Sequence, residues 1–150
     1  MKVGDYCKRA VVAIASSADA AQAAKLMRSQ HVGFLVVHRE GDPLQKPVGV
    51  LTDRDLVLGV MARDVDPHSV TVDDVMSREP LTANDGDELS DMLQAMRLAG
   101  FRRVPVLDFR GALIGIMALD DAIGVVSELM CDIAGSIKSE QRQEWRTRVG

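Results

Sequence analysis

The sequence predicts a mixed α/β (α+β) fold in which two β-α-β-β-α repeats pack about a pseudo-twofold axis, followed by an extended C-terminal helix. Two internal matches predict the repeats. The first match begins at Met27 with M-R-S-Q-H-V-G-F-L-V-V and recurs 69 residues later, at Met96, as M-R-L-A-G-F-R-R-V-P-V. V-G-V-L-T-D-R-D-L at Val48 returns as I-G-I-M-A-L-D-D-A at Ile114. Composition agrees, because 47% of the 150 residues are hydrophobic and only 3% are aromatic, which supplies one aliphatic core.

Each repeat is expected to begin with a short strand, at residues 11–14 and 80–83. A helix should follow, because a cap residue and an acid three positions later can satisfy free N–H groups. The predicted pairs are Ser16 with Asp19 and Asp85 with Glu88. Apolar residues then recur at helical spacing in both copies: Ala20, Ala23, Ala24 and Met27, and Leu89, Met92, Leu93 and Met96.

Two β-branched runs follow in each copy, and they predict an antiparallel hairpin in a largely buried sheet. They lie at residues 32–37 and 48–51, and again at 104–107 and 113–117. A second helix is expected from 53 to about 63, and its counterpart from 119 onward. We therefore divide the chain into repeat 1 at 6–65, a linker at 66–77 that follows the helix-breaking Pro67, repeat 2 at 75–130, and a helical extension at 131–150.

The last helix carries an apolar stripe with no counterpart in the first copy. It is formed at helical spacing by Ile123, Val126, Met130, Ile133 and Ile137. Two interpretations stay open. The helix can cover its own core and then fray in solvent. Alternatively, the stripe and the single tryptophan, Trp145, contact another subunit or another protein.

Charge and cysteine content exclude several classes of protein. A net charge of −4 argues against a broad basic face and therefore against nonspecific nucleic-acid binding. Cys7 and Cys131 form no C-x-x-C pair and are expected to be free thiols in a reducing compartment. Because no apolar run is long enough to span a membrane, we expect a cytoplasmic protein without a membrane segment.

The candidate chemistry lies where the second hairpin strand enters the second helix. There Thr52 can cap the helix and also offer its hydroxyl and nearby free N–H groups to an anion. Asp55 can accept hydrogen bonds from two sugar hydroxyls. In the second copy Ala118 replaces the threonine, while Asp121 remains. The simpler interpretation is that Thr52 only caps the helix and Asp55 only faces solvent.

These motifs, together with V-T-V-D-D-V-M-S-R-E-P-L-T from Val70, resemble a tandem pair of cystathionine β-synthase (CBS) domains, a Bateman module, over about residues 6–130. The resemblance implies a stand-alone module that commonly forms homodimers. It implies an adenosine-containing ligand such as AMP, ADP, ATP, NAD or S-adenosylmethionine. It also implies regulation of a partner protein in trans, including energy sensing, and no catalysis.

The resemblance also implies two clefts, each built from both copies. In the intact cleft Asp55 would hold the ribose, the backbone at Pro80 and Leu81 would read adenine, and Arg102 or Arg103 would neutralise phosphate. The full set is Thr52, Arg54, Asp55, Pro80, Leu81, Phe101, Arg102 and Arg103. The degenerate cleft would combine Ala118 and Asp121 with Val11, Val12, Val32, Gly33 and Phe34, without the hydroxyl or the arginines.

The remaining side chains do not suggest catalysis. His31, His38 and His68 lack partners at metal-ligand spacing, so we expect no metal site, no required cofactor, and Mg²⁺ only together with a nucleotide. Two functions stay open. The first is a regulatory module that binds AMP, ADP, ATP or an NAD-type nucleotide between the repeats. The second is a dimeric interaction or scaffold protein with vestigial clefts.

Overall fold

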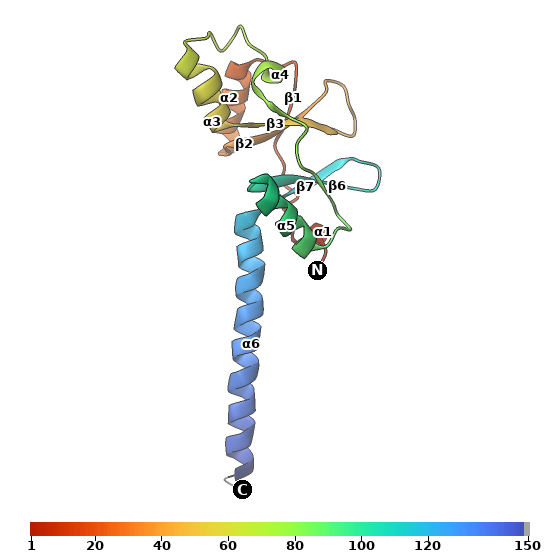
Figure 1. Ribbon diagram of the computed structural model, residues 1–150, viewed down its shortest axis with the longest axis vertical. Helices are drawn as coiled ribbons and strands as arrows, with labels where there is room; N and C mark the ends of the chain where they lie inside the picture. The colour runs from red at the N-terminus through yellow and green to blue at the C-terminus, as the bar shows by residue number, and fades with distance from the viewer. Residues whose placement is uncertain (149–150) are drawn as a thin grey trace.

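The computed structural model describes residues 1–148 and has two lobes, with a long helix projecting from the second (Figure 1). The first lobe contains β1 (Ala13–Ala15), α2 (Ala20–Gln30), β2 (Phe34–His38), β3 (Pro47–Thr52), α3 (Asp53–Gly59) and the 3₁₀ turn η1 (Met61–Arg63). The second lobe contains β5 (Ala83–Asn84), α5 (Leu89–Ala99), β6 (Arg103–Leu107), β7 (Leu113–Ala118) and α6 (Leu119–Arg148).

The predicted mixed fold with two equivalent repeats is confirmed. In each lobe the first strand runs parallel to the second, and the second pairs with the third in an antiparallel hairpin. Phe34 stands opposite Thr52 in the first hairpin, and Arg103 stands opposite Ala118 in the second. Each lobe has its own apolar core, in which Leu35 and Leu51, or Val104 and Met117, are fully buried.

Each core is closed by the segment that precedes the other repeat. Val72, in α4 (Val72–Val75), is fully buried in the first core, and its N–H donates to the Ala18 carbonyl at 2.8 Å. Val3, in α1 (Val3–Tyr6), is fully buried in the second core, and its N–H donates to the Asp87 carbonyl at 2.9 Å. The two repeats therefore exchange their leading segments.

The same exchange adds one strand partner to each hairpin. β4 (Ser77–Arg78) pairs with β3, and Lys8 forms the corresponding bridge to Ile116. The segment 66–77, which we expected to be a linker, thus contains α4 and reaches into β4, and its Met76 belongs to the first core. Our domain boundaries assign each segment to the repeat that is next to it in sequence. These boundaries remain a prediction.

The predicted helix caps are wrong by one turn. Ser16 still belongs to the strand end, because its N–H donates to the His38 carbonyl. The N-cap of α2 is Asp19, whose carboxylate accepts a hydrogen bond from the Gln22 N–H at 2.7 Å. Likewise Asp85 is not a cap, and Glu88 holds the N-cap position of α5 without a side-chain cap bond. In both copies a turn lies between the strand and the helix, so the N-cap stands three residues later than predicted.

Glu88 instead ties the amino terminus of the chain to α5. Its carboxylate pairs with the Lys2 ammonium and with the N-terminal ammonium, and these contacts lower the pKa of Glu88 below its ordinary value. A carboxyl whose pKa is lower in the folded state stabilises the fold above its unfolded pKa, and this stabilisation is lost as pH falls through the folded pKa. Glu88→Gln should therefore destabilise the protein at pH 6, and the difference from wild type should shrink as pH falls below about 4 and through the lowered pKa of Glu88.

Urea unfolding between pH 3 and pH 6 measures that difference. Glu79→Gln is the matched control, because Glu79 is also exposed and forms no ion pair among residues 1–148. A Glu88→Gln effect of equal size at pH 3 and pH 6 would show that the ion pairs do not contribute.

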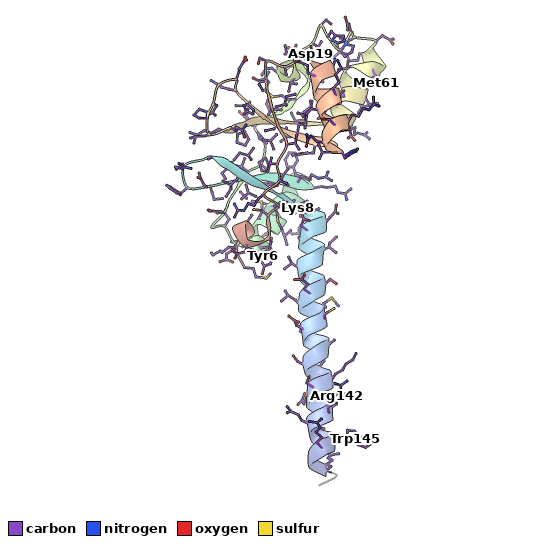
Figure 2. The ribbon with its side chains drawn as sticks, turned by 180° about the vertical axis from the view of Figure 1, so that it is seen from behind. Tyr6, Lys8, Asp19, Met61, Arg142 and Trp145 are labelled. Carbon is purple, nitrogen blue, oxygen red and sulfur yellow. The ribbon has the colours of Figure 1, made fainter. Side chains whose placement is uncertain are left out.

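The last helix, α6, leaves the second lobe after its second turn. Val125 is its last buried residue, and the stripe beyond it is exposed, with 63% of the Ile133 side chain open to solvent. The helix covers its own core through Ala122 and Val125, but the expectation that the stripe does so is wrong, because the stripe is exposed from Ile123 onward. Arg142 and Trp145 lie near the far end, well away from both lobes (Figure 2). Within residues 1–148, no helix has the length and apolar character to cross a membrane.

Candidate functional site

A pocket of about 230 Å³ lies where the two lobes meet. The first repeat supplies β2, β3 and the start of α3, and the second supplies the residues that lead into β6. Its lining residues are Phe34, Val50, Thr52, Asp55, Ser77, Gly100, Phe101, Arg102 and Arg103. The structure thus brings together five of the eight residues predicted for the intact cleft: Thr52, Asp55, Phe101, Arg102 and Arg103.

Thr52 and Asp55 form a reciprocal cap at the start of α3. The Asp55 N–H donates to Thr52 Oγ1 at 3.1 Å, and the Thr52 N–H donates to Asp55 Oδ2 at 2.8 Å. Thr52 therefore caps the helix, as both interpretations expect. The arrangement leaves Asp55 Oδ1 and the Thr52 hydroxyl hydrogen for other partners, since a carboxylate has two oxygens and a hydroxyl both accepts and donates.

The free N–H groups that we expected beside Thr52 are all engaged. The Asp53 N–H donates to the Gly33 carbonyl at 3.0 Å, and the Arg54 N–H donates to Asp53 Oδ1 at 2.8 Å. The N–H groups of Thr52 and Asp55 are used by the cap. No N–H group beside Thr52 is free to receive an anion in this structure, so a phosphate in the pocket calls for a cationic side chain.

The two arginines of the pocket differ in their surroundings. The Arg102 guanidinium lies 3.7 Å from an Asp120 carboxylate oxygen at the start of α6, and 76% of its side chain is exposed. The Arg103 guanidinium makes no ion pair with any residue that the structure describes. Arg103 is thus the cation with the fewest competing partners at this pocket.

Three predicted residues do not line the pocket. Arg54 is exposed on α3, and Pro80 and Leu81 are partly buried, with Leu81 packed against the second core. Phe34, Val50, Ser77 and Gly100 line it although the sequence analysis did not assign them to it. The predicted hairpin was the signal for Phe34, because Phe34 stands opposite Thr52 in it.

A second pocket, of about 250 Å³, lies on the pseudosymmetric side of the lobe junction. Its lining includes the predicted Val11, Val12, Val32, Gly33 and Phe34, together with Lys8, Ala10, His31, Arg103 and Ile116. The expectation that this cleft lacks arginine is therefore wrong, because Arg103 reaches both pockets.

The two residues predicted as the ribose side of the second cleft do not line it. Ala118 is buried, and Asp121 Oδ1 lies 2.7 Å from Lys8 Nζ. Asp121 Oδ2 is buried without a hydrogen-bond partner among residues 1–148. Lys8 thus holds the carboxylate whose counterpart, Asp55, lines the first pocket. Figure 2 shows Lys8 beside the first turns of α6.

No group of three His, Cys, Asp or Glu side chains within residues 1–148 is placed to hold a metal ion. Burial raises the pKa of the Cys7 thiol, which disfavours the reactive thiolate. The lining of the first pocket is suited to binding, because it combines the Asp55 carboxylate, the guanidinium groups of Arg102 and Arg103, and the rings of Phe34 and Phe101.

Comparison with known proteins gives one consistent result. The family model described as "CBS domain" matches residues 3–62 and 72–128. Protein MK0525 of Methanopyrus kandleri is 31% identical over 95% of this chain and 71% of its own length. The CBS domain-containing protein YhcV of Bacillus subtilis is 34% identical over 89% of this chain and 90% of its own length.

Solved structures agree with the sequence matches. The CBS domain protein PAE2072 from Pyrobaculum aerophilum, complexed with AMP, superposes with a TM-score of 0.72 at 25% identity. The match covers 81% of this chain and 89% of the other. The similarity therefore extends over both lobes.

Proposed function

This chain belongs to the CBS domain family as a tandem pair of repeats, and on that premise we propose that it is a regulatory module that binds an adenosine nucleotide in the pocket of Thr52, Asp55 and Arg103. The observation that carries the proposal is that this pocket joins an acceptor from one repeat to a cation from the other. The AMP held by the similar protein PAE2072 supports the class of ligand.

The proposed roles follow from the chemistry of the residues that line the pocket. Asp55 Oδ1 is not used by the cap, so it accepts hydrogen bonds from ribose hydroxyls. Arg103 neutralises phosphate, because the backbone beside Thr52 has no N–H group to spare. The aromatic rings of Phe34 and Phe101 offer surfaces for the adenine base, where base–aromatic stacking contributes about 1–3 kcal/mol.

Signalling follows from the position of the pocket between repeats. A ligand held by both repeats stabilises the relative orientation that it binds best, and it shifts the equilibrium only by that difference in affinity. We propose that a partner protein in trans reads this orientation, with no chemical step in the module itself. Asp121 is held by Lys8, so we expect one nucleotide for each chain.

Asp55→Asn tests the ribose assignment. The amide oxygen of asparagine can still accept the Thr52 N–H, so the cap is preserved while the charge is lost. A hydrogen bond to a charged group contributes about 1.5–3 kcal/mol, so AMP affinity should fall by about 10- to 150-fold. Titration calorimetry with AMP, ADP, ATP, NAD and S-adenosylmethionine, with and without Mg²⁺, measures affinity and stoichiometry together.

Asp53→Asn is the matched control, because Asp53 is two residues away, exposed, and outside the pocket lining. Its affinity should equal that of wild type. If both variants lost the same AMP affinity, or if Asp55→Asn lost none, the assignment of Asp55 to the binding site would be wrong. Absence of binding by every nucleotide at millimolar concentration would overturn the proposal in favour of the second function.

That second function is a dimeric interaction protein with vestigial clefts. Two observations favour it: the stripe on α6 is exposed, and Lys8 holds the Asp121 carboxylate of the second cleft. It differs from the first proposal in requiring no ligand for activity.

A further inference from the structure

The exposed stripe of α6 has the spacing of a coiled-coil seam. Its residues follow one another at alternating steps of four and three, which is the heptad pattern of two paired helices. From Ile123 to Ile137 their side chains are 49–67% exposed. A single helix that projects into water without packing is marginally stable, so this surface calls for a partner. The five residues of the stripe are preceded at the same spacing by Leu119, which is half-buried against the second core and is counted with them.

A groove beside the stripe offers space for apolar side chains of a second helix. It has a volume of about 430 Å³ and lies between α5, which contributes Leu93, and the first three turns of α6. The α6 residues that line it are Leu119, Ala122, Ile123, Val126, Ser127 and Met130. The groove and the stripe are therefore one continuous apolar surface.

We propose that this surface pairs with α6 of a second copy of the chain, in antiparallel orientation. In that orientation Leu119 faces Ile137 of the partner subunit, Ile123 faces Ile133 of the partner subunit, and Val126 faces Met130 of the partner subunit. These pairs, and their symmetric equivalents, use every residue of the stripe. The stripe is thus complementary to itself when one helix is reversed.

The uneven distribution of charge along α6 favours the antiparallel orientation over the parallel one, although the positions flanking the seam between Ile123 and Ile137 are uncharged. Residues 119–132 carry four acidic side chains and no basic one, whereas residues 133–148 carry four basic and two acidic side chains. Antiparallel helices place the acidic half of one beside the basic half of the other. Parallel helices place acidic beside acidic, and they also bring Glu140 and Glu144, which continue the seam, against their own copies.

The residues around the seam favour a second copy over a membrane surface. The positions flanking the seam include Ser127, Ala134 and Ser136, which are small and uncharged and let two helices approach closely. The outer face beside the stripe carries Glu128 and Asp132, whereas helices that lie on membranes carry Lys and Arg there.

Disulfide trapping tests both the partner and the orientation. Two differently tagged full-length chains, one with Val126→Cys and one with Met130→Cys, are mixed in a background of Cys7→Ser and Cys131→Ser. Antiparallel pairing brings positions 126 and 130 together, so the mixture should form a heterodisulfide, while each chain alone should stay reduced. A homodisulfide of either chain alone would overturn the antiparallel orientation, and no disulfide in any sample would overturn the pairing.

Ile133→Asp in both chains should lower the heterodisulfide yield at least about tenfold, because it places a carboxylate against Ile123 of the partner subunit. Position 133 is exposed and lies beyond the lobe, so the substitution leaves the body of the protein folded. Cys131→Asp in place of Cys131→Ser adds the same charge on the outer face and should leave the yield unchanged. Equal yields with Ile133→Asp and Cys131→Asp would also overturn the proposal.

Discussion

Deletion of residues 2–8 is expected to unfold the second repeat, although these residues precede the first. The deletion removes Val3 from the second core and removes the bridge in which Lys8 N–H donates to the Ile116 carbonyl at 2.9 Å and Ile116 N–H donates to the Lys8 carbonyl at 2.8 Å. One buried valine and several backbone hydrogen bonds together contribute about 4–6 kcal/mol. That loss is comparable with the whole stability of a small domain, about 5–15 kcal/mol.

Hydrogen exchange locates the effect along the chain. Amide protection should disappear from α5, β6 and β7 and persist in α2, β2 and β3. Deletion of residues 139–150 is the control. Residues 139–146 are exposed, so this deletion should leave amide protection in both sheets unchanged. If deletion of residues 2–8 removed amide protection mainly from the first sheet, the exchange of leading segments between the repeats would be contradicted.

A matched pair of point substitutions separates the two cores without changing chain length. Val3 and Val72 occupy equivalent positions and are both fully buried. Val3→Ala should weaken protection in the second sheet, and Val72→Ala should weaken it in the first. The pair thus tests which segment closes which core.

The hairpins were predictable because their signal is local. The β-branched runs that become β2, β3, β6 and β7 alternate with polar turns, and pairing within a hairpin needs no information from distant residues. The exchange of α1 and α4 was not predictable from the same signal. It depends on which lobe receives Val3 and Val72, and nothing in their local sequence distinguishes the two cores.

The site shows the same division between local and distant information. Thr52 and Asp55 are three residues apart at a strand end, so their proximity follows from helix geometry alone. The family resemblance predicted that Arg102 and Arg103 line the same cleft as Thr52 and Asp55. Both arginines line that pocket in the structure. The engagement of the nearby N–H groups was missed, because one acceptor is the Gly33 carbonyl, which lies 20 positions from Asp53.

Arg103→Glu is expected to have the largest effect on nucleotide binding. The substitution removes the only pocket cation without an ion pair among residues 1–148 and replaces it with a charge that repels phosphate. Loss of a charge-assisted hydrogen bond, and repulsion of similar size, predict about a thousandfold weaker ATP binding. Adenosine, which has no phosphate, should lose much less affinity, so titration with adenosine, AMP and ATP should give a loss that grows with phosphate charge.

Arg102→Glu is the control for that series, since it changes the same charge one residue away. Its guanidinium is already near Asp120, and most of its side chain is exposed to solvent, which screens its field. The loss of ATP affinity should therefore be at least about tenfold smaller than for Arg103→Glu. A larger loss for Arg102→Glu would assign the phosphate to the side of the pocket that faces α6. Equal losses for adenosine and ATP would instead indicate that Arg103 shapes the pocket and does not meet phosphate.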